Sequence, residues 1–313
     1  MILNRIEKLK KKFNKFGIDG YVIPKNDEYF SEYSENDRLK FISHFSGSAG
    51  YAIILKNKNY LFVDSRYTIQ AEMESGKYFK IIDLKKIVNC KLFKNLVLGI
   101  DPKLFTSNQT LKFFKRYNQI KEIRFNLVDF LFNKYSPQTK RFYSLSKNIV
   151  GECHKTKVNK IINFLKKNKL NYLFVSAPEN VAWLLNIRGH DTSYAPLPNS
   201  HAIINKDGEI LLFCDLNKIE KSFLVKKYKN IKIYDFNLLP NFFLNLSKKN
   251  IFIDSSTCSI FYKSIIKKNN SILEKQDPIY YLKSLKNKTE IKNSIKSHIY
   301  DGAALTKFIF WLK

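Results

Sequence analysis

The segment Asp64-Ser65-Arg66-Tyr67 is the part of this sequence best suited to chemistry. Residues 60–64 are typical of a strand and residues 65–75 of a helix, so the segment is predicted to join the two, with Asp64 as the helix cap. Side chains at such junctions project from a sheet edge toward clefts. Arg66 is one of seven arginines against 48 lysines, and its planar charged fork suits a carboxylate or carbonyl partner. Two interpretations stay open: a ligand contact, and an ion pair within the domain.

Two other segments are weaker candidates for binding. Arg188, in Asn186-Ile187-Arg188-Gly189, allows the same argument as Arg66, but a structural ion pair is the favoured interpretation. The glycine-rich run Ser46-Gly47-Ser48-Ala49-Gly50 has the composition of a phosphate-binding loop. Such a loop opens a helix, however, whereas a strand-like apolar pattern follows Gly50. We therefore predict a tight turn that leads into a strand.

Cysteine, histidine and acidic residues form no pattern typical of a catalytic or metal centre. The four cysteines include no CxxC pair, and the five histidines include no HExxH motif. Cys153 and His154 are adjacent, whereas the partners of a Cys-His dyad come from different elements, so we interpret them as part of a linker. The sequence thus predicts no catalytic residue and no metal ligand in this chain. Scattered cysteines also favour a reducing compartment.

The net charge of +28 suggests nucleic acid at first sight. The composition weakens that interpretation, because the excess is lysine, which is spread along the chain, whereas base recognition favours arginine forks. Lys, Asn, Ile and Phe share A/T-rich codons, so a biased genome accounts for the excess. We predict no nucleic-acid partner.

The N-terminal segment is predicted to be a folded helix. Ile2, Ile6, Leu9, Phe13 and Phe16 recur on one helical face, with lysines on the other. A signal peptide needs a continuous apolar run, and a membrane-spanning helix needs about 18 consecutive apolar residues; neither is present. We therefore expect a cytoplasmic protein with no membrane partner.

The two halves of the chain share one pattern. Residues 18–24 align with residues 170–176, and the predicted hairpin 51–64 has a counterpart in 202–215, so that Asp64 corresponds to Asp215. An amphipathic helix precedes each pair. Hairpins make part of each sheet antiparallel, so we predict two similar α/β domains, each a mixed sheet flanked by helices. Their predicted limits are residues 1–135 and 150–277, with the boundary in the polar stretch 136–156, which includes Ser136 and Pro137.

The last segment, residues 278–313, fits neither domain. Asn287 or Thr289 is predicted to cap a helix with Glu290 in its first turn. Its apolar face comprises Ile291, Ile295, Ile299, Leu305, Phe308 and Leu312. A long helix with such a face needs something to pack on. Three partners stay open: the second domain, a second chain, or further sequence.

Several longer motifs occur together in one order. They are Phe41-Ile-Ser-His-Phe45, Gly47-Ser-Ala-Gly50, Asp64-Ser-Arg66-Tyr67, Asn180-Val-Ala-Trp183-Leu-Leu-Asn186-Ile-Arg188-Gly189 and His298-Ile-Tyr-Asp301-Gly-Ala-Ala-Leu305. This set resembles the long, three-domain form of Xaa-Pro aminopeptidase (aminopeptidase P), of the creatinase/pita-bread metallopeptidase family. The resemblance covers nearly the whole chain. It implies two creatinase-N-terminal-like domains, with residues 278–313 as the lead-in and first helix of a pita-bread catalytic domain that this chain lacks.

The resemblance also implies a function. Family members remove the N-terminal residue from peptides with proline in second position, using two divalent metals, usually manganese, that activate a water molecule. The metal ligands lie in the pita-bread domain, so this chain alone is predicted to hold no cofactor and to be inactive. Arg66 matches the substrate-binding arginine of the family's Asp-Gly-Arg-Tyr pattern, although Ser65 replaces the glycine.

Two functional hypotheses follow. In the first, the chain is the N-terminal part of a Xaa-Pro aminopeptidase and contributes substrate binding and the contacts of a homodimer formed through the N-terminal domains. In the second, it is a non-catalytic module that binds peptides or a protein on the same scaffold.

Overall fold

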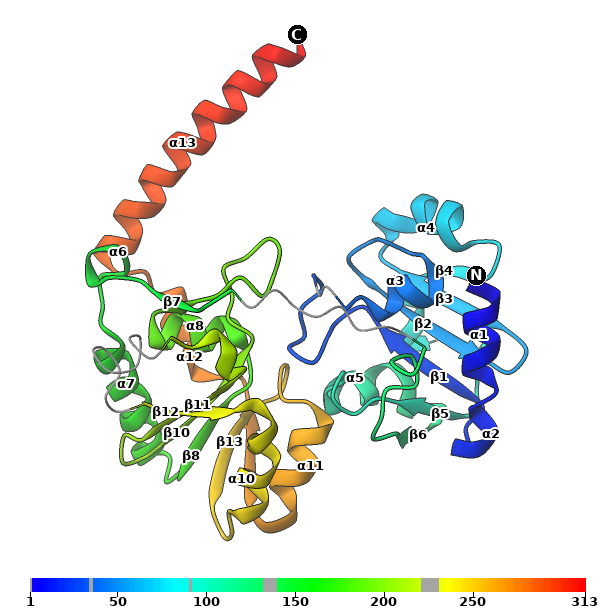
Figure 1. The fold of residues 1–313 in the computed structure, drawn as a ribbon, viewed down its shortest axis with the longest axis horizontal. Coiled ribbons are helices and arrows are strands. Elements are labelled where there is room, and N and C mark those ends of the chain that lie inside the picture. The colour runs from blue at the N-terminus through cyan, green and yellow to red at the C-terminus, as the bar shows by residue number, and fades with distance from the viewer. Residues whose placement is uncertain (1, 34–35, 90–91, 132–139, 221–230) are drawn as a thin grey trace.

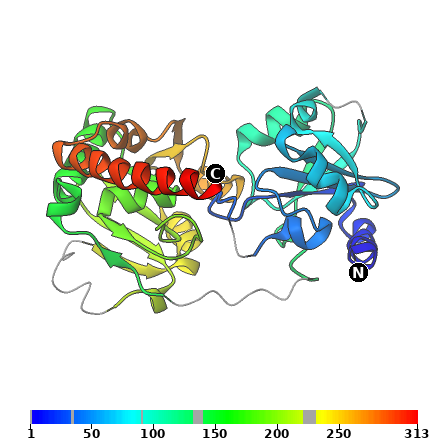
Figure 2. The ribbon, with the colours of Figure 1, turned by 90° about the horizontal axis from the view of Figure 1, so that it is seen from above.

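The computed structural model describes residues 2–33, 36–89, 92–131, 140–220 and 231–313. Two α/β domains lie side by side, and a long helix projects from the second (Figures 1 and 2). The predicted end of the first domain at residue 135 lies outside the described residues, as do the boundary residues Ser136 and Pro137. One of the four cysteines, Cys90, lies outside them as well.

The first domain is built on a six-stranded mixed sheet. Its strands are β1 (Gly20–Pro24), β2 (Gly50–Leu55), β3 (Asn59–Val63), β4 (Lys80–Asp83), β5 (Val97–Ile100) and β6 (Gln119–Glu122). They lie in the order β4-β3-β2-β1-β5-β6, with β2 antiparallel to both neighbours and all other pairs parallel. Successive side chains point to opposite faces, so Val22 joins one core cluster while Tyr21 and Ile23 join the other. Both faces are buried, which explains why the central strands are apolar on both sides.

Helices cover both faces of this sheet. They are α1 (Ile2–Lys10), α2 (Phe13–Phe16), α3 (Arg38–Ser43), α4 (Thr68–Ser75) and α5 (Ser107–Thr110), with shorter turns η1 (Ser65–Tyr67), η2 (Leu84–Asn89) and η3 (Leu111–Lys115). The predicted first helix forms, but a turn at residues 11–12 divides it in two. Its predicted apolar face is buried as expected, since Ile6, Leu9 and Phe13 are fully enclosed.

The second domain repeats the sheet of the first. Its strands are β8 (Tyr172–Val175), β10 (Ser200–Asn205), β11 (Ile210–Cys214), β12 (Ile231–Asp235), β13 (Asn250–Asp254) and β14 (Ser271–Lys275). Their order, β12-β11-β10-β8-β13-β14, and their directions match the first sheet strand for strand. The prediction of two similar mixed-sheet domains is therefore confirmed.

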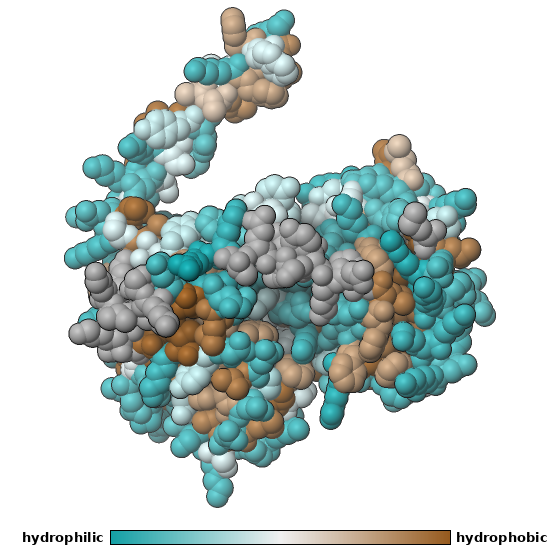
Figure 3. Space-filling view, viewed as in Figure 1, coloured by the Kyte–Doolittle hydropathy of each residue, from teal (hydrophilic) through white to brown (hydrophobic). Residues whose placement is uncertain are grey.

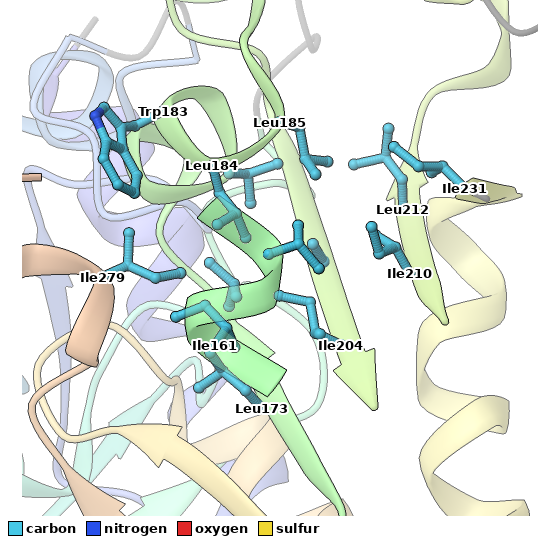
Figure 4. Close-up of a cluster of buried hydrophobic side chains, with 14 of the residues drawn as sticks. Ile161, Leu173, Trp183, Leu184, Leu185, Ile204, Ile210, Leu212, Ile231 and Ile279 are labelled. Carbon is cyan, nitrogen blue, oxygen red and sulfur yellow. The ribbon is translucent and has the colours of Figure 1, made fainter. Parts of the chain in front are cut away.

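The helices of the second domain pack around a core that Figure 4 shows in part. They are α6 (Lys147–Val150), α7 (His154–Lys167), α8 (Pro178–Leu185), α10 (Leu239–Asn245), α11 (Ile260–Asn269) and α12 (Pro278–Ser284). Trp183, Leu184 and Leu185 of α8 all lie in this core. The linker interpretation of Cys153 and His154 is wrong, because His154 begins α7 and Cys153 occupies the position just before it.

Aspartates end corresponding strands in both domains. The side chain of Asp64, after β3, accepts a hydrogen bond from the backbone N–H of Arg66, and Asp215, after β11, accepts one from Asn217. Both distances are 3.0 Å. The predicted equivalence of the two acids is confirmed. Each satisfies an amide that the following short helical turn leaves without an internal partner.

A tyrosine of the first domain anchors the two domains to each other. Tyr29, in the loop after β1, places its ring 5.2 Å from His201 and 5.7 Å from Phe236 of the second domain. Phe174 and Tyr262 complete an aromatic group around His201, each at 5.4 Å. Burial lowers the pKa of His201 to about 3, so its ring is neutral at this contact.

Backbone hydrogen bonds add a second link between the domains. The N–H of Ile260, at the start of α11, donates to Phe105 O at 2.8 Å, and Phe261 donates to Pro102 O at 3.0 Å. The Ile260 side chain is itself buried in a core cluster of the first domain. The start of α11 therefore belongs in part to the core of its neighbour.

The C-terminal helix α13 (Lys288–Leu312) is rooted on the second domain and then leaves it. Asn287 and Glu290 form a reciprocal capping box, as predicted for Asn287, and the Asn287 amide donates to Val150 O at 2.9 Å. Beyond this root the helix rises from the domain and leans toward the first one (Figures 1 and 2). Its predicted apolar face is exposed, for example Ile299 at 65%, so within the described chain neither domain packs on it. Among the described residues there is no helix with the length and apolar character needed to cross a membrane.

We predict that a buried carboxylate makes the loop after β1 sensitive to pH. Asp27 is buried, and its Oδ1 accepts hydrogen bonds from the backbone N–H groups of Tyr29 and Ser31, both at 2.9 Å. Burial raises its pKa from 3.8 to about 6. The folded state thus holds the proton more tightly than the unfolded state, so this contribution to stability is present below pH 4 and is lost as the pH rises through 6.

Asp27→Asn keeps the accepting oxygen and removes the charge. We expect equal free energies of unfolding for the variant and the wild type at pH 4. At pH 7.5 the variant should be more stable, by up to about 3 kcal/mol, because the pKa shift from 3.8 to about 6 is worth about 1.4 kcal/mol per pKa unit. Urea unfolding at the two pH values checks this. A variant that is less stable at pH 7.5 would mean that the ionised carboxylate stabilises the loop.

Candidate functional site

Arg66 lies in the short turn η1, directly after β3. Its Nε donates to Asp64 Oδ1 at 2.8 Å, and this hydrogen bond raises the pKa of Arg66 and lowers that of Asp64. The intradomain ion pair is therefore real. However, the Arg66 side chain is 71% exposed, and exposed pairs stabilise a fold only weakly. The terminal nitrogens of Arg66 have no hydrogen-bond partner among the described residues, so the pair orients the guanidinium and leaves its outer edge available.

The glycine-rich turn at residues 46–50 contacts Tyr67, the residue that follows Arg66. Tyr67 lies with its ring 5.3 Å from the Arg66 guanidinium carbon, and its hydroxyl is 3.0 Å from Ser48 Oγ. Ser46 is bound to α4 through its N–H and hydroxyl, which both donate to Glu74 at 2.8 and 2.7 Å. The prediction of a tight turn before a strand is confirmed, since β2 begins at Gly50.

Two loops bring further polar and aromatic side chains near Arg66. The charge of Glu32 contributes to the raised pKa of Arg66, and a hydrogen bond to Glu32 raises the pKa of Tyr33. The ring of Tyr33 meets Tyr194 of the second domain edge-on, with centroids 5.1 Å apart. We call Arg66, Tyr67, Glu32, Tyr33 and Tyr194 the seam cluster. Sequence reasoning found Arg66 but not Glu32, Tyr33 or Tyr194 as site residues, because no local pattern distinguishes a loop tyrosine that meets another domain.

Two other arginines, Arg188 and Arg38, have structural roles. Arg188 donates through one terminal nitrogen to the carbonyl oxygens of Ala182 and Ile187 at 2.9 and 2.8 Å. Its role is therefore structural, and these two bonds go to backbone carbonyls and not to a carboxylate. Arg38 is buried, and its guanidinium bonds Asp129 and Glu28, each at 2.6 Å. Arg38 thereby ties α3 to the loop after β1.

A cavity of about 290 Å³ opens at the carboxyl ends of β1, β5 and β6. It is lined by Glu28, Asp101, Lys103, Arg124, Phe125, Asn126, Asp129 and Phe130. Open α/β sheets commonly bind ligands where neighbouring connections diverge, as they do between β1 and β5. Its acids already have partners, since Glu28 and Asp129 bond Arg38 and Asp101 accepts from Asn126 at 3.0 Å. The three carboxylates that line the cavity are therefore already bonded to neighbouring side chains.

At the corresponding strand ends of the second domain, side chains are bonded to one another. Asn180 donates to Asp277 at 2.9 Å and accepts from Lys283 Nζ at 2.8 Å, so that α12 is tied across the strand ends. The two domains thus share a sheet but carry different side chains at these strand ends.

No three His, Cys, Asp or Glu side chains within the described ranges are grouped closely enough to hold a metal ion. Three cysteines in these ranges, Cys153, Cys214 and Cys258, are free thiols. These residues therefore do not fit a di-nuclear metal centre.

Arg38 and Arg66 make a matched pair for a stability test. Arg38→Ala should lower the free energy of unfolding by about 3 kcal/mol, because it leaves two partly buried carboxylates without their partner. Arg66→Ala should leave the unfolding midpoint unchanged, since the lost pair is exposed. Urea unfolding of both variants beside the wild type checks this. If Arg66→Ala destabilises the chain as much as Arg38→Ala does, the Asp64 pair is the main role of Arg66.

Comparisons with known proteins bear on this arrangement. Two family models, both described as "Creatinase/Prolidase N-terminal domain", match the chain, one at residues 5–130 and the other at residues 133–290. A relative named "Probable Xaa-Pro aminopeptidase P" from Laccaria bicolor is 31% identical over 99% of this chain and 51% of the relative. "Xaa-Pro aminopeptidase 1" of Dictyostelium discoideum is 29% identical over 100% of this chain and 53% of the relative. The chain thus spans about half the length of these relatives.

A solved structure matches the whole chain. It is X-prolyl aminopeptidase from Caenorhabditis elegans, described as a cytosolic enzyme with a di-nuclear active site. The TM-score is 0.89 at 27% identity, and the match covers 100% of this chain and 56% of that protein. The resemblance deduced from the motifs is confirmed. The chain belongs to the creatinase/prolidase N-terminal domain family and corresponds to the N-terminal region of an aminopeptidase P.

Proposed function

We propose that this chain forms the N-terminal and middle parts of a Xaa-Pro aminopeptidase and binds peptide substrates with proline in second position. The observation that carries this proposal is the match over the full chain to an X-prolyl aminopeptidase at a TM-score of 0.89. Two adjacent N-terminal-domain matches support the same assignment. Catalysis itself is assigned to a pita-bread domain outside these 313 residues.

We propose three segments within the chain: residues 1–135 and 150–277 as the two α/β domains, and residues 278–313 as the lead-in and first helix of the catalytic domain. The exposed apolar face of α13 supports the third assignment, because such a face requires a packing partner. Apolar surface is visible along α13 in Figure 3.

Arg66 is the residue we propose to contact the substrate. Its outer guanidinium edge is available while Asp64 holds its inner edge. In Figure 1, α4, which follows Arg66, lies at the top of the first domain, and α13 rises above the second domain on the same side of the molecule. A catalytic domain packed on α13 would therefore stand over the Arg66 side of the first domain.

The proposed function also implies bound metals, a cellular location and an oligomeric state. We assign two divalent metals, of which manganese is the expected kind, to the catalytic domain, since the described residues of this chain offer no fitting group. A cytoplasmic location is supported by the description of the worm relative as cytosolic. We also propose a homodimer through the N-terminal domains, for which Ile69 and Met73 of α4, 77% and 84% exposed, are the candidate contact.

Hydrolysis tests this division of labour. The 313-residue chain should release no N-terminal residue from an Ala-Pro peptide, with or without added Mn²⁺, because no water would be activated. A hybrid in which the chain is fused to the catalytic half of the Laccaria bicolor relative should do so. Release by the chain alone would contradict the proposal. Peptide binding by the chain with an inactive hybrid would favour the alternative, a non-catalytic binding module.

In the active hybrid, Arg66→Ala should lower kcat/KM about ten- to a hundredfold, the cost of one charge-assisted hydrogen bond. Arg66→Lys should recover only part of this loss, because it keeps the charge without the planar fork. Arg116→Ala serves as the arginine control. Unchanged kinetics in Arg66→Ala would remove Arg66 from the binding site.

Hydrogen exchange tests the proposed role of α13. In the 313-residue monomer, amides from about residue 289 onward should exchange quickly, because few tertiary contacts hold that helix. In the active hybrid the same amides should become protected. Strong protection in a verified monomer would mean that the apolar face packs on the chain's own domains.

A further inference from the structure

A buried lysine lies beneath the root of α13. Lys157 of α7 is 1% exposed, and no carboxylate of the described residues lies within ion-pair distance of its ammonium. Burial lowers the pKa of Lys157 to about 8, while the charges of Glu290 and Glu152 act to raise it, so the ammonium is charged at pH 7. A buried charge is costly unless neighbouring groups stabilise it. Its contacts therefore indicate what the charge is needed for.

The ammonium contacts three groups at the end of α8. Nζ of Lys157 donates to Trp183 O and to Asn186 Oδ1, both at 2.8 Å. It also lies 4.1 Å from the centre of the Trp183 ring, within the range of a cation–π contact. Trp183 O is one of the last carbonyls of α8, which a helix leaves without internal partners and where a cation is favoured. Lys157 therefore fixes both the end of α8 and the Trp183 side chain.

The Trp183 side chain connects this ammonium to α13. Its indole Nε1 donates to Glu290 Oε1 at 3.4 Å. The other oxygen of Glu290 accepts from the backbone N–H of Asn287 at 2.8 Å, which closes one half of the capping box of α13. One path of contacts thus runs from Lys157 through the indole to the first turn of α13.

A second path runs through the loop at residues 149–152. Asn186, which accepts from Lys157, donates to one carbonyl of this loop at 2.9 Å. Asn287 and Asn293, at the start of α13, donate to two more of its carbonyls at 2.9 and 3.0 Å. The glycine of the loop allows this close approach, because a Cβ there would lie 2.3 Å from Asn287 Oδ1. The loop is thus bonded to α8 and to α13 at once.

We propose that Lys157 is the positioning residue of a joint that sets the direction in which α13 leaves the second domain. Two paths from one buried charge reach the first two turns of α13, and separate contacts fix a direction where a single contact would let the helix swing. Because no residue of α13 is buried, its direction is decided at this joint. A helix held in place beforehand loses less conformational entropy when a partner packs on it. The inference concerns the chain by itself and does not depend on which partner that is.

Spin-label distances in the 313-residue chain at pH 7 test the joint. Labels are attached after the substitutions Lys267→Cys in α11 and Lys296→Cys in α13, both at exposed positions. Double electron–electron resonance between them reports how widely the start of α13 swings against its domain. Serine replaces Cys90 and Cys153, and the two remaining thiols are buried. We expect one narrow distance in this parent chain.

Lys157→Met should lose the single narrow distance, because its thioether chain fills the space without bonding Trp183 O or Asn186. If this variant does not fold, a double variant that keeps Lys157 takes its place. Trp183→Phe removes the indole donor and keeps a ring, and Asn186→Gly removes the amide and suits the left-handed backbone at φ 55°. It should lose the narrow distance too. Lys160→Met is the matched control on the same helix, in a half-exposed pair with Glu152, and should keep the narrow distance.

The other outcomes would overturn the proposal. A broad distance in the parent chain would mean that α13 has no fixed direction. A lower unfolding midpoint in Lys157→Met with an unchanged narrow distance would make Lys157 a core stabiliser only. Equal broadening in Lys160→Met would trace the effect to α7 as a whole. An unchanged distance in the double variant would show that neither path holds α13.

Discussion

Tyr29 of the first domain packs against His201 of the second, and this aromatic contact and the backbone bonds of Ile260 and Phe261 together hold the two domains in place. The aromatic group around His201 is apolar enough to keep the ring neutral, so no buried charge opposes the contact. Ile260 completes a core cluster of the opposite domain. These contacts make the seam an extension of two cores, and they set the distance between Tyr33 and Tyr194.

The two domains show how one sheet serves two purposes. Their strand orders are identical, and aspartates cap corresponding strand ends. At the carboxyl ends of the parallel strands, Asn180 bonds Asp277 and Lys283 in the second domain, whereas a cavity opens in the first. The repeat thus provides the scaffold, and the substitutions at the strand ends decide which domain can offer a site.

Arginine and lysine divide the work of this basic chain. The buried guanidinium of Arg38 bonds two carboxylates, those of Glu28 and Asp129. A lysine ammonium could not bond both in the same geometry. Arg66 is bonded along one edge and exposed along the other. Most lysines are spread widely over the chain and contribute net charge, which favours solubility. Lys218 and Lys283 are exceptions, since they bond Asp191 and Asn180 within the second domain.

Local pattern was enough to determine the elements that alternate apolar and polar residues or bury one helical face. It predicted β1 to β3, their counterparts β8, β10 and β11, the Asp64 cap and the start of α13 at Asn287. It did not predict the interior strands β5 and β13, or the edge strands β4, β6, β12 and β14. The edge strands have four or five residues, are half exposed and carry little alternation. Of the seam cluster, Arg66 was predicted, but the contact between Tyr33 and Tyr194 could not be. Tyr33 and Tyr194 belong to different domains, and their contact exists only after both domains have folded and docked.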